Sequence, residues 1–264
     1  MALLRCDFFS EVLGMGVSAT VVLPQRTSGQ IGVASGGGDG PPPVLYLLHG
    51  LSDDHTAWTR YTSVERYAND AGLAVVMPAV ADSWYVNEVH GHRYLDFVAD
   101  ELPQVVRSLV RVSDAPADTF VAGLSMGGYG AVKLALRHPE RYAAAASLSG
   151  ALDVARVPER WPELRPLFDR VFGGGVTPAD DLFSGLEQAY APLPPLYLAC
   201  GTEDPDVEAT RRFHAAAVGA GADVVLDLRP GDHEWGLWDA VIRDVVAWLP
   251  MRGRPSGPRP VAVT

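Results

Sequence analysis

The sequence predicts an α/β protein built on one mostly parallel sheet that carries helices on both faces. Short apolar runs alternate with helical patterns over residues 43–249, which is typical of parallel strands joined by helices. The run Val44–Leu48 is apolar throughout, as expected for a strand that is buried on both faces of a sheet. The sequence contains no internal repeat, so we predict a single domain over residues 1–249.

Two β-rich segments precede the alternating part of the chain. Residues 8–11 and 16–23 are expected to form an antiparallel edge, because the second segment is rich in β-branched residues and stops at Pro24. Residues 28–43 contain three consecutive glycines and three consecutive prolines, which predicts a mobile surface connection. The sheet is then expected to continue with strands at residues 44–48, 74–77, 119–122, 143–148, 195–200 and 224–228.

The helices between these strands are predicted from capping residues and from composition. Ser63 is expected to cap a helix that ends at Ala71, and Pro139 follows a helical pattern over residues 126–137. Further helices are predicted over residues 94–109, 208–218 and 235–249.

Two segments depart from this pattern. Residues 150–191 contain short helical pieces, for which a lid-like insertion over the site and a merely structural insertion are both open interpretations. Residues 250–264 contain four prolines and are expected to be a disordered tail.

Composition excludes several classes of partner. The chain of 264 residues carries 32 acidic and 21 basic side chains, and its net charge of −11 disfavours binding to nucleic acid or to an anionic membrane. Its two cysteines, Cys6 and Cys200, are too few for a disulfide framework. No secretory leader and no apolar run long enough to span a bilayer are found, so we expect a cytoplasmic protein. Assembly into a homo-oligomer is left open.

A Gly-x-Ser-x-Gly motif lies at the junction of a predicted strand and a predicted helix. A serine at the apex of such a turn has a strained backbone, and small residues two positions before and after it let the two arms approach. Gly123 and Gly127 meet this requirement around Ser125. The start of the helix also directs its N–H groups toward the serine oxygen. The motif predicts that Ser125 is a nucleophile.

A nucleophilic serine needs a base and an acid that orients the base. Catalytic groups of parallel sheets follow the carboxyl ends of strands, and His233 lies in a glycine-containing turn after the last predicted strand. The loop after the preceding strand offers Asp204 as first choice for the acid, then Asp206, then Glu203. The order Ser125, Asp204, His233 is that of α/β-hydrolases, which is therefore the predicted fold.

The developing oxyanion needs two backbone N–H donors. Met126, the residue after the nucleophile, is expected to supply one of them, and Leu51 in the turn after Val44–Leu48 the other. His49 in the same turn is expected to have a structural role.

Three aromatic residues follow predicted strands on the same side of the sheet. Trp58, Trp84 and Tyr85 are expected either to line a small apolar acyl pocket or to pack in the core. His90 and His92 with Glu88 could bind a metal ion, but a solvated loop explains them and serine chemistry needs no metal. We therefore predict no metal and no cofactor.

The sequence resembles the esterase D group of α/β-hydrolases, which includes S-formylglutathione hydrolases, tributyrin esterases and, more distantly, secreted mycolyltransferases. It is most similar to the tributyrin esterases in its short N-terminal motif and in Gly-Thr-Glu-Asp. Pro205 is a departure, because the family more often has an apolar or aromatic residue after the acid. The matching motifs are FFSEVLGM at residues 8–15, LLHGL at 47–51, DSWY at 82–85, DELP at 100–103, GLSMGG at 123–128, CGTED at 200–204 and GDHEW at 231–235.

The resemblance implies a serine carboxylesterase that hydrolyses short-chain acyl esters of small molecules, with Ser125, Asp204 and His233 as triad and Leu51 and Met126 as oxyanion donors. Two alternatives use the same machinery: a thioesterase of the S-formylglutathione hydrolase type and an acyltransferase. A non-catalytic binding protein that keeps the fold is an alternative of another class.

Overall fold

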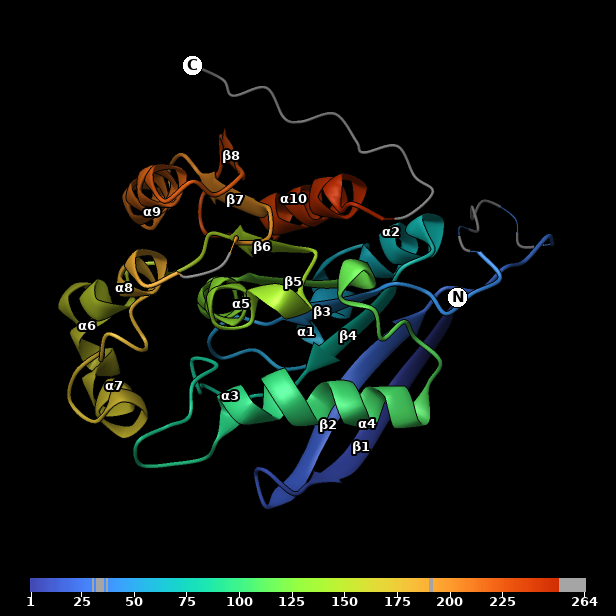
Figure 1. Ribbon diagram of the computed structural model, residues 1–264, viewed down its shortest axis with the longest axis horizontal. Coiled ribbons are helices and arrows are strands. Elements are labelled where there is room, and N and C mark those ends of the chain that lie inside the picture. The colour runs from blue at the N-terminus through green and yellow to red at the C-terminus, as the bar shows by residue number, and fades with distance from the viewer. Residues whose placement is uncertain (30, 32–35, 37, 190–191, 252–264) are drawn as a thin grey trace.

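The computed structural model describes residues 1–29, 31, 36, 38–189 and 192–251. Within these residues, eight strands form one sheet in the order β1-β2-β4-β3-β5-β6-β7-β8 (Figure 1). The first two strands and the β2–β4 pair are antiparallel, and every other neighbouring pair is parallel. The strands are β1 (Ala2–Ser10), β2 (Met15–Leu23), β3 (Val44–Leu48), β4 (Ala74–Pro78), β5 (Thr119–Leu124), β6 (Ala144–Leu148), β7 (Leu196–Gly201) and β8 (Val224–Arg229).

Helices cover both faces of the sheet (Figure 1). The longer helices are α2 (Val64–Ala71), α4 (Leu102–Leu109), α5 (Met126–Arg137), α7 (Arg165–Phe172), α9 (Val207–Gly219) and α10 (Trp235–Trp248). Shorter ones are α1 (Ala57–Tyr61), α3 (Tyr94–Asp96), α6 (Val157–Arg160) and α8 (Leu182–Glu187). Short 3₁₀ turns lie at Pro116–Asp118, Pro139–Arg141, Val154–Arg156 and Pro162–Leu164.

The alternation of side chains along β3 separates the two layers of the core. Tyr46 and Leu48 face a cluster that includes residues of α4, α5 and α9, whereas Leu45 and Leu47 face one that includes residues of α1, α2 and α10. All residues of β3 are buried, as the uniformly apolar sequence predicts. The predicted mostly parallel sheet with helices on both faces is confirmed.

Three details differ from the expectation. β1 covers Ala2–Ser10 and so begins earlier than the strand predicted over residues 8–11. Ser63 precedes α2 but its side chain makes no capping hydrogen bond; instead its backbone N–H donates to Asp239 Oδ1 at 2.7 Å. The helix predicted over residues 94–109 contains a π-helical turn at Phe97–Glu101. Glu101, at its end, accepts hydrogen bonds from the Ser10 hydroxyl and the Glu11 N–H, which ties α4 to the β1–β2 hairpin.

The segment of residues 150–191 contributes α6, α7 and α8, which lie together at the left of Figure 1, beyond α5. The surface connection predicted over residues 28–43 and the tail predicted over 250–264 lie partly outside the described residues. Within residues 250–264, Met251 is buried and its N–H donates to Leu249 O at 2.8 Å, so the core includes a residue beyond 249. None of the described helices combines the length and apolar character needed to cross a bilayer.

Candidate active site

Ser125 lies at a sharp turn between β5 and α5. Its φ of 52° and ψ of −117° fall in a region that non-glycine residues rarely adopt, and such strain costs about 1–3 kcal/mol. A Cβ at Gly123 would collide with the backbone of Gly127, and a Cβ at Gly127 would lie 2.5 Å from Leu48 O. The close approach of strand and helix therefore requires both glycines, and it presents the serine at the end of the strand.

His233 and Asp204 are brought together from the loops after β8 and β7. His233 Nδ1 lies 2.9 Å from Asp204 Oδ2, and Asp204 Oδ1 accepts the Asp206 N–H at 2.8 Å. Burial works to raise the pKa of Asp204, but the hydrogen bonds from His233 and Asp206 hold it below its usual value. Burial likewise works to lower the pKa of His233, but Asp204 outweighs it and raises that pKa. Asp204 is thus held as a carboxylate beside an imidazole whose pKa it raises.

The two loops are also bound to each other. Glu203 N donates to Gly231 O at 3.1 Å, and Glu203 Oε2 accepts the Gly231 N–H at 2.6 Å. A Cβ at Gly201 would collide with Gly231 O, so the loops approach more closely than another residue would allow. Glu203, which the sequence offered third for the acid, therefore hydrogen-bonds the loop of His233 at Gly231 and is not paired with the imidazole.

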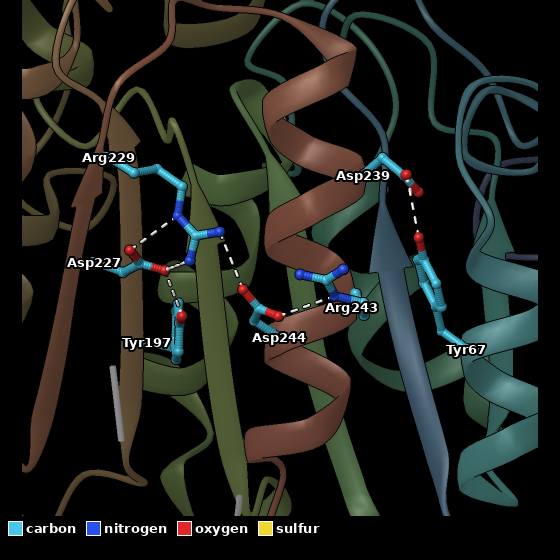
Figure 2. A network of polar contacts seen from close by, with 7 residues as sticks. All are labelled: Tyr67, Tyr197, Asp227, Arg229, Asp239, Arg243 and Asp244. Atoms are coloured by element: carbon cyan, nitrogen blue, oxygen red, sulfur yellow. Dashed lines mark hydrogen bonds and ion pairs between the residues drawn. The ribbon is translucent and has the colours of Figure 1, made fainter. Parts of the chain in front are cut away.

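A polar network holds the end of β8 that leads to His233 (Figure 2). Arg229, the last residue of β8, binds Asp227 through two nitrogens and Asp244 of α10 at 3.0 Å. The hydroxyl of Tyr197 in β7 donates to Asp227 Oδ2 at 2.5 Å. The network joins β7, β8 and α10 directly before the loop of His233.

Trp238 and Ser149 are two residues near the His233–Asp204 pair that the sequence reasoning missed. The ring of Trp238 packs edge-on against His233 with centroids 4.9 Å apart, and its Nε1 donates to Ser149 Oγ at 3.1 Å. Ser149 follows β6 and has a φ of 47°. The signal available in the sequence was the position of Trp238 on the first turns of the helix that directly follows His233.

A cavity of about 380 Å³ opens at the carboxyl ends of the parallel strands. The loops after the six strands β3 to β8 all contribute to its wall. The loop after β7 contributes two residues and each of the others one: Leu51, Trp84, Ser125, Ala151, Pro205, Asp206 and His233. The remaining wall comes from residues 157–164, through Val157, Trp161, Glu163 and Leu164. The expected nucleophile and base thus lie on one mostly apolar cavity.

Trp58 and Tyr85 do not line this cavity, so packing in the core, the second of the two roles expected for them, fits their positions. Both are fully buried. Trp58 Nε1 donates to Leu48 O at 3.1 Å, and the Tyr85 hydroxyl donates to His49 O at 2.9 Å. These aromatic residues instead hold the turn that follows β3. Trp84 does line the cavity.

The turn after β3 is positioned against the nucleophile. His49 is buried; its Nε2 accepts the Val80 N–H at 3.1 Å and its Nδ1 lies 2.8 Å from Gly50 O. Burial lowers the pKa of His49, which fits a neutral imidazole with its proton on Nδ1. A Cβ at Gly50 would lie 3.6 Å from the Ser125 Cβ. The expected structural role of His49 agrees with these contacts.

The histidines considered for a metal site do not converge with Glu88. Glu88 pairs with Arg170 at 3.3 Å and accepts the His92 N–H at 2.9 Å. Among the described residues, the one group with ligand atoms close enough for a metal ion is Asp204, Asp206 and His233. Their side chains are already engaged in the contacts of the candidate site.

The sequential order of these side chains separates this site from other serine enzymes. The expected nucleophile, acid and base, Ser125, Asp204 and His233, follow one another along the chain as in α/β-hydrolases, unlike in the trypsin-like and subtilisin-like layouts. Fold and site together define a serine hydrolase of the α/β-hydrolase class.

Comparison with known proteins gives the family. The model of the Esterase family matches residues 10–249, and the chain belongs to this family. An acetyl esterase of Caldicellulosiruptor saccharolyticus is 26% identical over 94% of this chain and 98% of its own. The fluorophosphonate-binding serine hydrolase FphF of Staphylococcus aureus is 31% identical, with a TM-score of 0.84 over 94% of this chain and 98% of its own.

The S-formylglutathione hydrolase FrmB of Staphylococcus aureus is also 31% identical, with a TM-score of 0.80 and the same coverage of both chains. The resemblance to the esterase D group is therefore confirmed, and so is the expected class of enzyme: the protein is a serine hydrolase that acts on carboxylic ester bonds.

Proposed function

We propose that the protein hydrolyses short-chain acyl esters of small molecules with Ser125 as nucleophile, His233 as base and Asp204 as the acid that orients it. The observation that carries this proposal is that His233 Nδ1 pairs with Asp204 while His233 and Ser125 line the same cavity. With Nδ1 engaged, Nε2 is the ring nitrogen left to take the serine proton.

The reaction then runs in two halves. Ser125 Oγ attacks the ester carbonyl as His233 Nε2 takes its proton, and the imidazolium returns this proton to the leaving alcohol. Water next attacks the acyl-enzyme with His233 again as base, which releases the acid and restores Ser125. Asp204 stays ionised throughout and stabilises the imidazolium.

The backbone N–H groups of Leu51 and Met126 are proposed to bind the oxyanion. Met126 is the first residue of α5, so its N–H has no partner within the helix and adds to the positive end of the helix dipole. Leu51 lines the cavity beside Ser125. Loss of one such donor typically costs about 3 kcal/mol of transition-state stabilisation.

A short acyl chain is supported by the size and walls of the cavity. A volume of about 380 Å³ lies near the small end of ligand sites, and Trp84, Trp161 and Leu164 narrow it. Relatives named acetyl esterase and S-formylglutathione hydrolase act on similarly small acyl groups. The second name keeps a thioesterase as the second candidate, and an acyltransferase would use the same acyl-enzyme.

Residues 150–191 are proposed to act as a lid-like wall, because five of them line one side of the cavity. Cytoplasmic location, assembly into a homo-oligomer and the particular likeness to tributyrin esterases stay predictions.

Replacing the nucleophile tests the proposal. Ser125→Ala should lower the turnover of p-nitrophenyl acetate by about 10⁶-fold with an unchanged circular dichroism spectrum. Ser108→Ala, which alters an exposed serine on α4, is the matched control and should retain full activity. Retained turnover in Ser125→Ala would refute the assignment. Parallel assays with S-formylglutathione and with competing alcohols separate esterase, thioesterase and transferase.

A further inference from the structure

A second carboxylate lies beside the candidate base. Ligand atoms of Asp204, Asp206 and His233 all lie within 4.8 Å of one another. The side chain of Asp206 is only 5% exposed, although it lies on the cavity wall. A buried carboxylate so close to an imidazole would compete with Asp204 for it unless another group held it.

Arg160 holds this carboxylate. Its NH1 nitrogen donates to Asp206 Oδ1 at 2.7 Å, and its guanidinium lies over the ring of Trp161 at 4.8 Å. Arg160 is the last residue of α6, in the segment of residues 150–191, and Trp161 lines the cavity. The backbone N–H of Asp206 donates to Asp204, so a continuous chain of contacts runs from the cavity wall to the acid.

We propose that the Arg160–Asp206 ion pair is a positioning device for the active site. It neutralises the second carboxylate beside His233, which leaves Asp204 to orient the base, and it fastens the cavity wall of residues 157–164 to the loop of the acid. This inference rests on the proposed function for its meaning in catalysis. Arg160 acts through Asp206 and is a positioning residue.

The charges around His233 determine whether loss of Arg160 or Asp206 raises or lowers the pKa of its imidazole. Asp204 and Asp206 face it from the loop after β7, and Asp232 is its neighbour in the chain; all three favour the protonated imidazole. Glu163 lies on the cavity wall contributed by residues 150–191, and Trp238 of α10 presents an uncharged ring. Further negative charges lie on Glu203, whose carboxylate binds the Gly231 N–H, and on Glu234 next to the histidine. Arg160 is the cation tied to this acidic group.

Removing either partner therefore has opposite consequences. In Arg160→Gln the charge of Asp206 is uncompensated, so protonation of His233 becomes easier. In Asp206→Asn the charge of Arg160 is uncompensated, so protonation becomes harder. The double variant carries neither charge and should lie near the unmodified protein.

An NMR titration of the His233 imidazole measures these effects without requiring turnover. We expect Arg160→Gln to raise the midpoint by about one pH unit, Asp206→Asn to lower it by a similar amount, and the double variant to restore it. Arg160→Lys should rescue most of the change. The matched control is Arg170→Gln. Arg170 lies in the same segment of residues 150–191 as Arg160 but pairs with the buried Glu88, so its loss should leave the midpoint of His233 unchanged.

Ester kinetics test the second half of the proposal. In Arg160→Gln a loosened wall should raise KM for p-nitrophenyl butyrate more than KM for the acetate, and kcat should fall because Asp206 then competes with Asp204 for His233. Equal KM changes for the two esters would overturn this half of the proposal.

Unchanged midpoints in both Arg160→Gln and Asp206→Asn would overturn the inference, as would equal shifts in the Arg170→Gln control. If Arg160→Gln does not fold, Asp206→Asn and the double variant still decide the question. If the proposed function is wrong, the unmodified protein will show no ester turnover. The NMR titration of His233 would still show whether the Arg160–Asp206 pair sets its midpoint.

Discussion

Replacing Arg229 by methionine tests how the loop of the candidate base is held. Figure 2 shows the guanidinium bound to Asp227 through two nitrogens and to Asp244. The contact with Asp244 is 3.0 Å long. Asp227 is 7% exposed, so its carboxylate has little access to water once the cation is removed. Methionine keeps much of the apolar stem of the side chain while it removes all donors.

The expected loss follows from the burial of the partners. Removing one member of a fully buried ion pair costs about 3–5 kcal/mol. The Arg229 side chain is 26% exposed and Tyr197 still donates to Asp227, which places the expected loss at about 2–3 kcal/mol. For a chain of this size the loss corresponds to a fall in Tm of about 4–12 °C.

Urea unfolding followed by circular dichroism measures this loss. Arg243→Met is the matched control, because Arg243 binds the same Asp244 at 3.2 Å but its side chain is 60% exposed, so a cost of about 0–0.5 kcal/mol is expected. Adding Asp227→Asn to Arg229→Met should recover part of the stability by removing the buried charge. Equal costs for Arg229→Met and Arg243→Met would refute the reasoning.

Three further predictions concern the site itself. Asp204→Asn should lower kcat by about 10⁴-fold in the p-nitrophenyl acetate assay, since an amide no longer holds His233 in the required tautomer, and a loss under tenfold would contradict this role. Because Asp204 raises the pKa of His233, and only the deprotonated imidazole accepts a proton, kcat/KM should fall as pH drops through a midpoint above about 6.5; a midpoint below that value in a pH series would argue against the base. Gly127→Ala should lower turnover by about 100-fold, because its Cβ would lie 2.5 Å from Leu48 O and displace the turn; full activity with an unchanged Tm would disprove that need for glycine.

The sequence was most informative where a local pattern determines the local structure. Alternation of apolar runs and helical patterns predicted the parallel sheet, and the glycines around Ser125 predicted the strained turn between β5 and α5. The order of strands and loops was enough to select His233 and Asp204 for one another. Each of these inferences depends on residues close in sequence or on the rule that strand ends share one edge.

The direction of side chains after the strands could not be predicted in the same way. Trp84 and Tyr85 are adjacent and both have positive φ values, 54° and 53°. Trp84 nevertheless lines the cavity, whereas Tyr85 is buried in the core against Gly130 of α5. Trp58 is likewise drawn inward, where its ring meets Trp235 of α10. The direction of each of these side chains depends on the room left by packing between helices and strands that are distant in sequence.

The supporting contacts were missed for a related reason. Arg160 and Asp206 belong to segments whose relative position depends on how α6 packs against the loop after β7. Ser149 and Trp238 likewise come from separate strands and helices. No short motif contains both members of either pair, so only the packed structure reveals them.

Labelling with a fluorophosphonate probe tests the central claim most directly, because the probe reacts with a serine only where a base and oxyanion donors activate it. Peptide mapping by mass spectrometry should find one adduct, on Ser125, that disappears in Ser125→Ala and forms far more slowly in Asp204→Asn. An adduct on another serine, or no adduct on folded protein, would contradict the account.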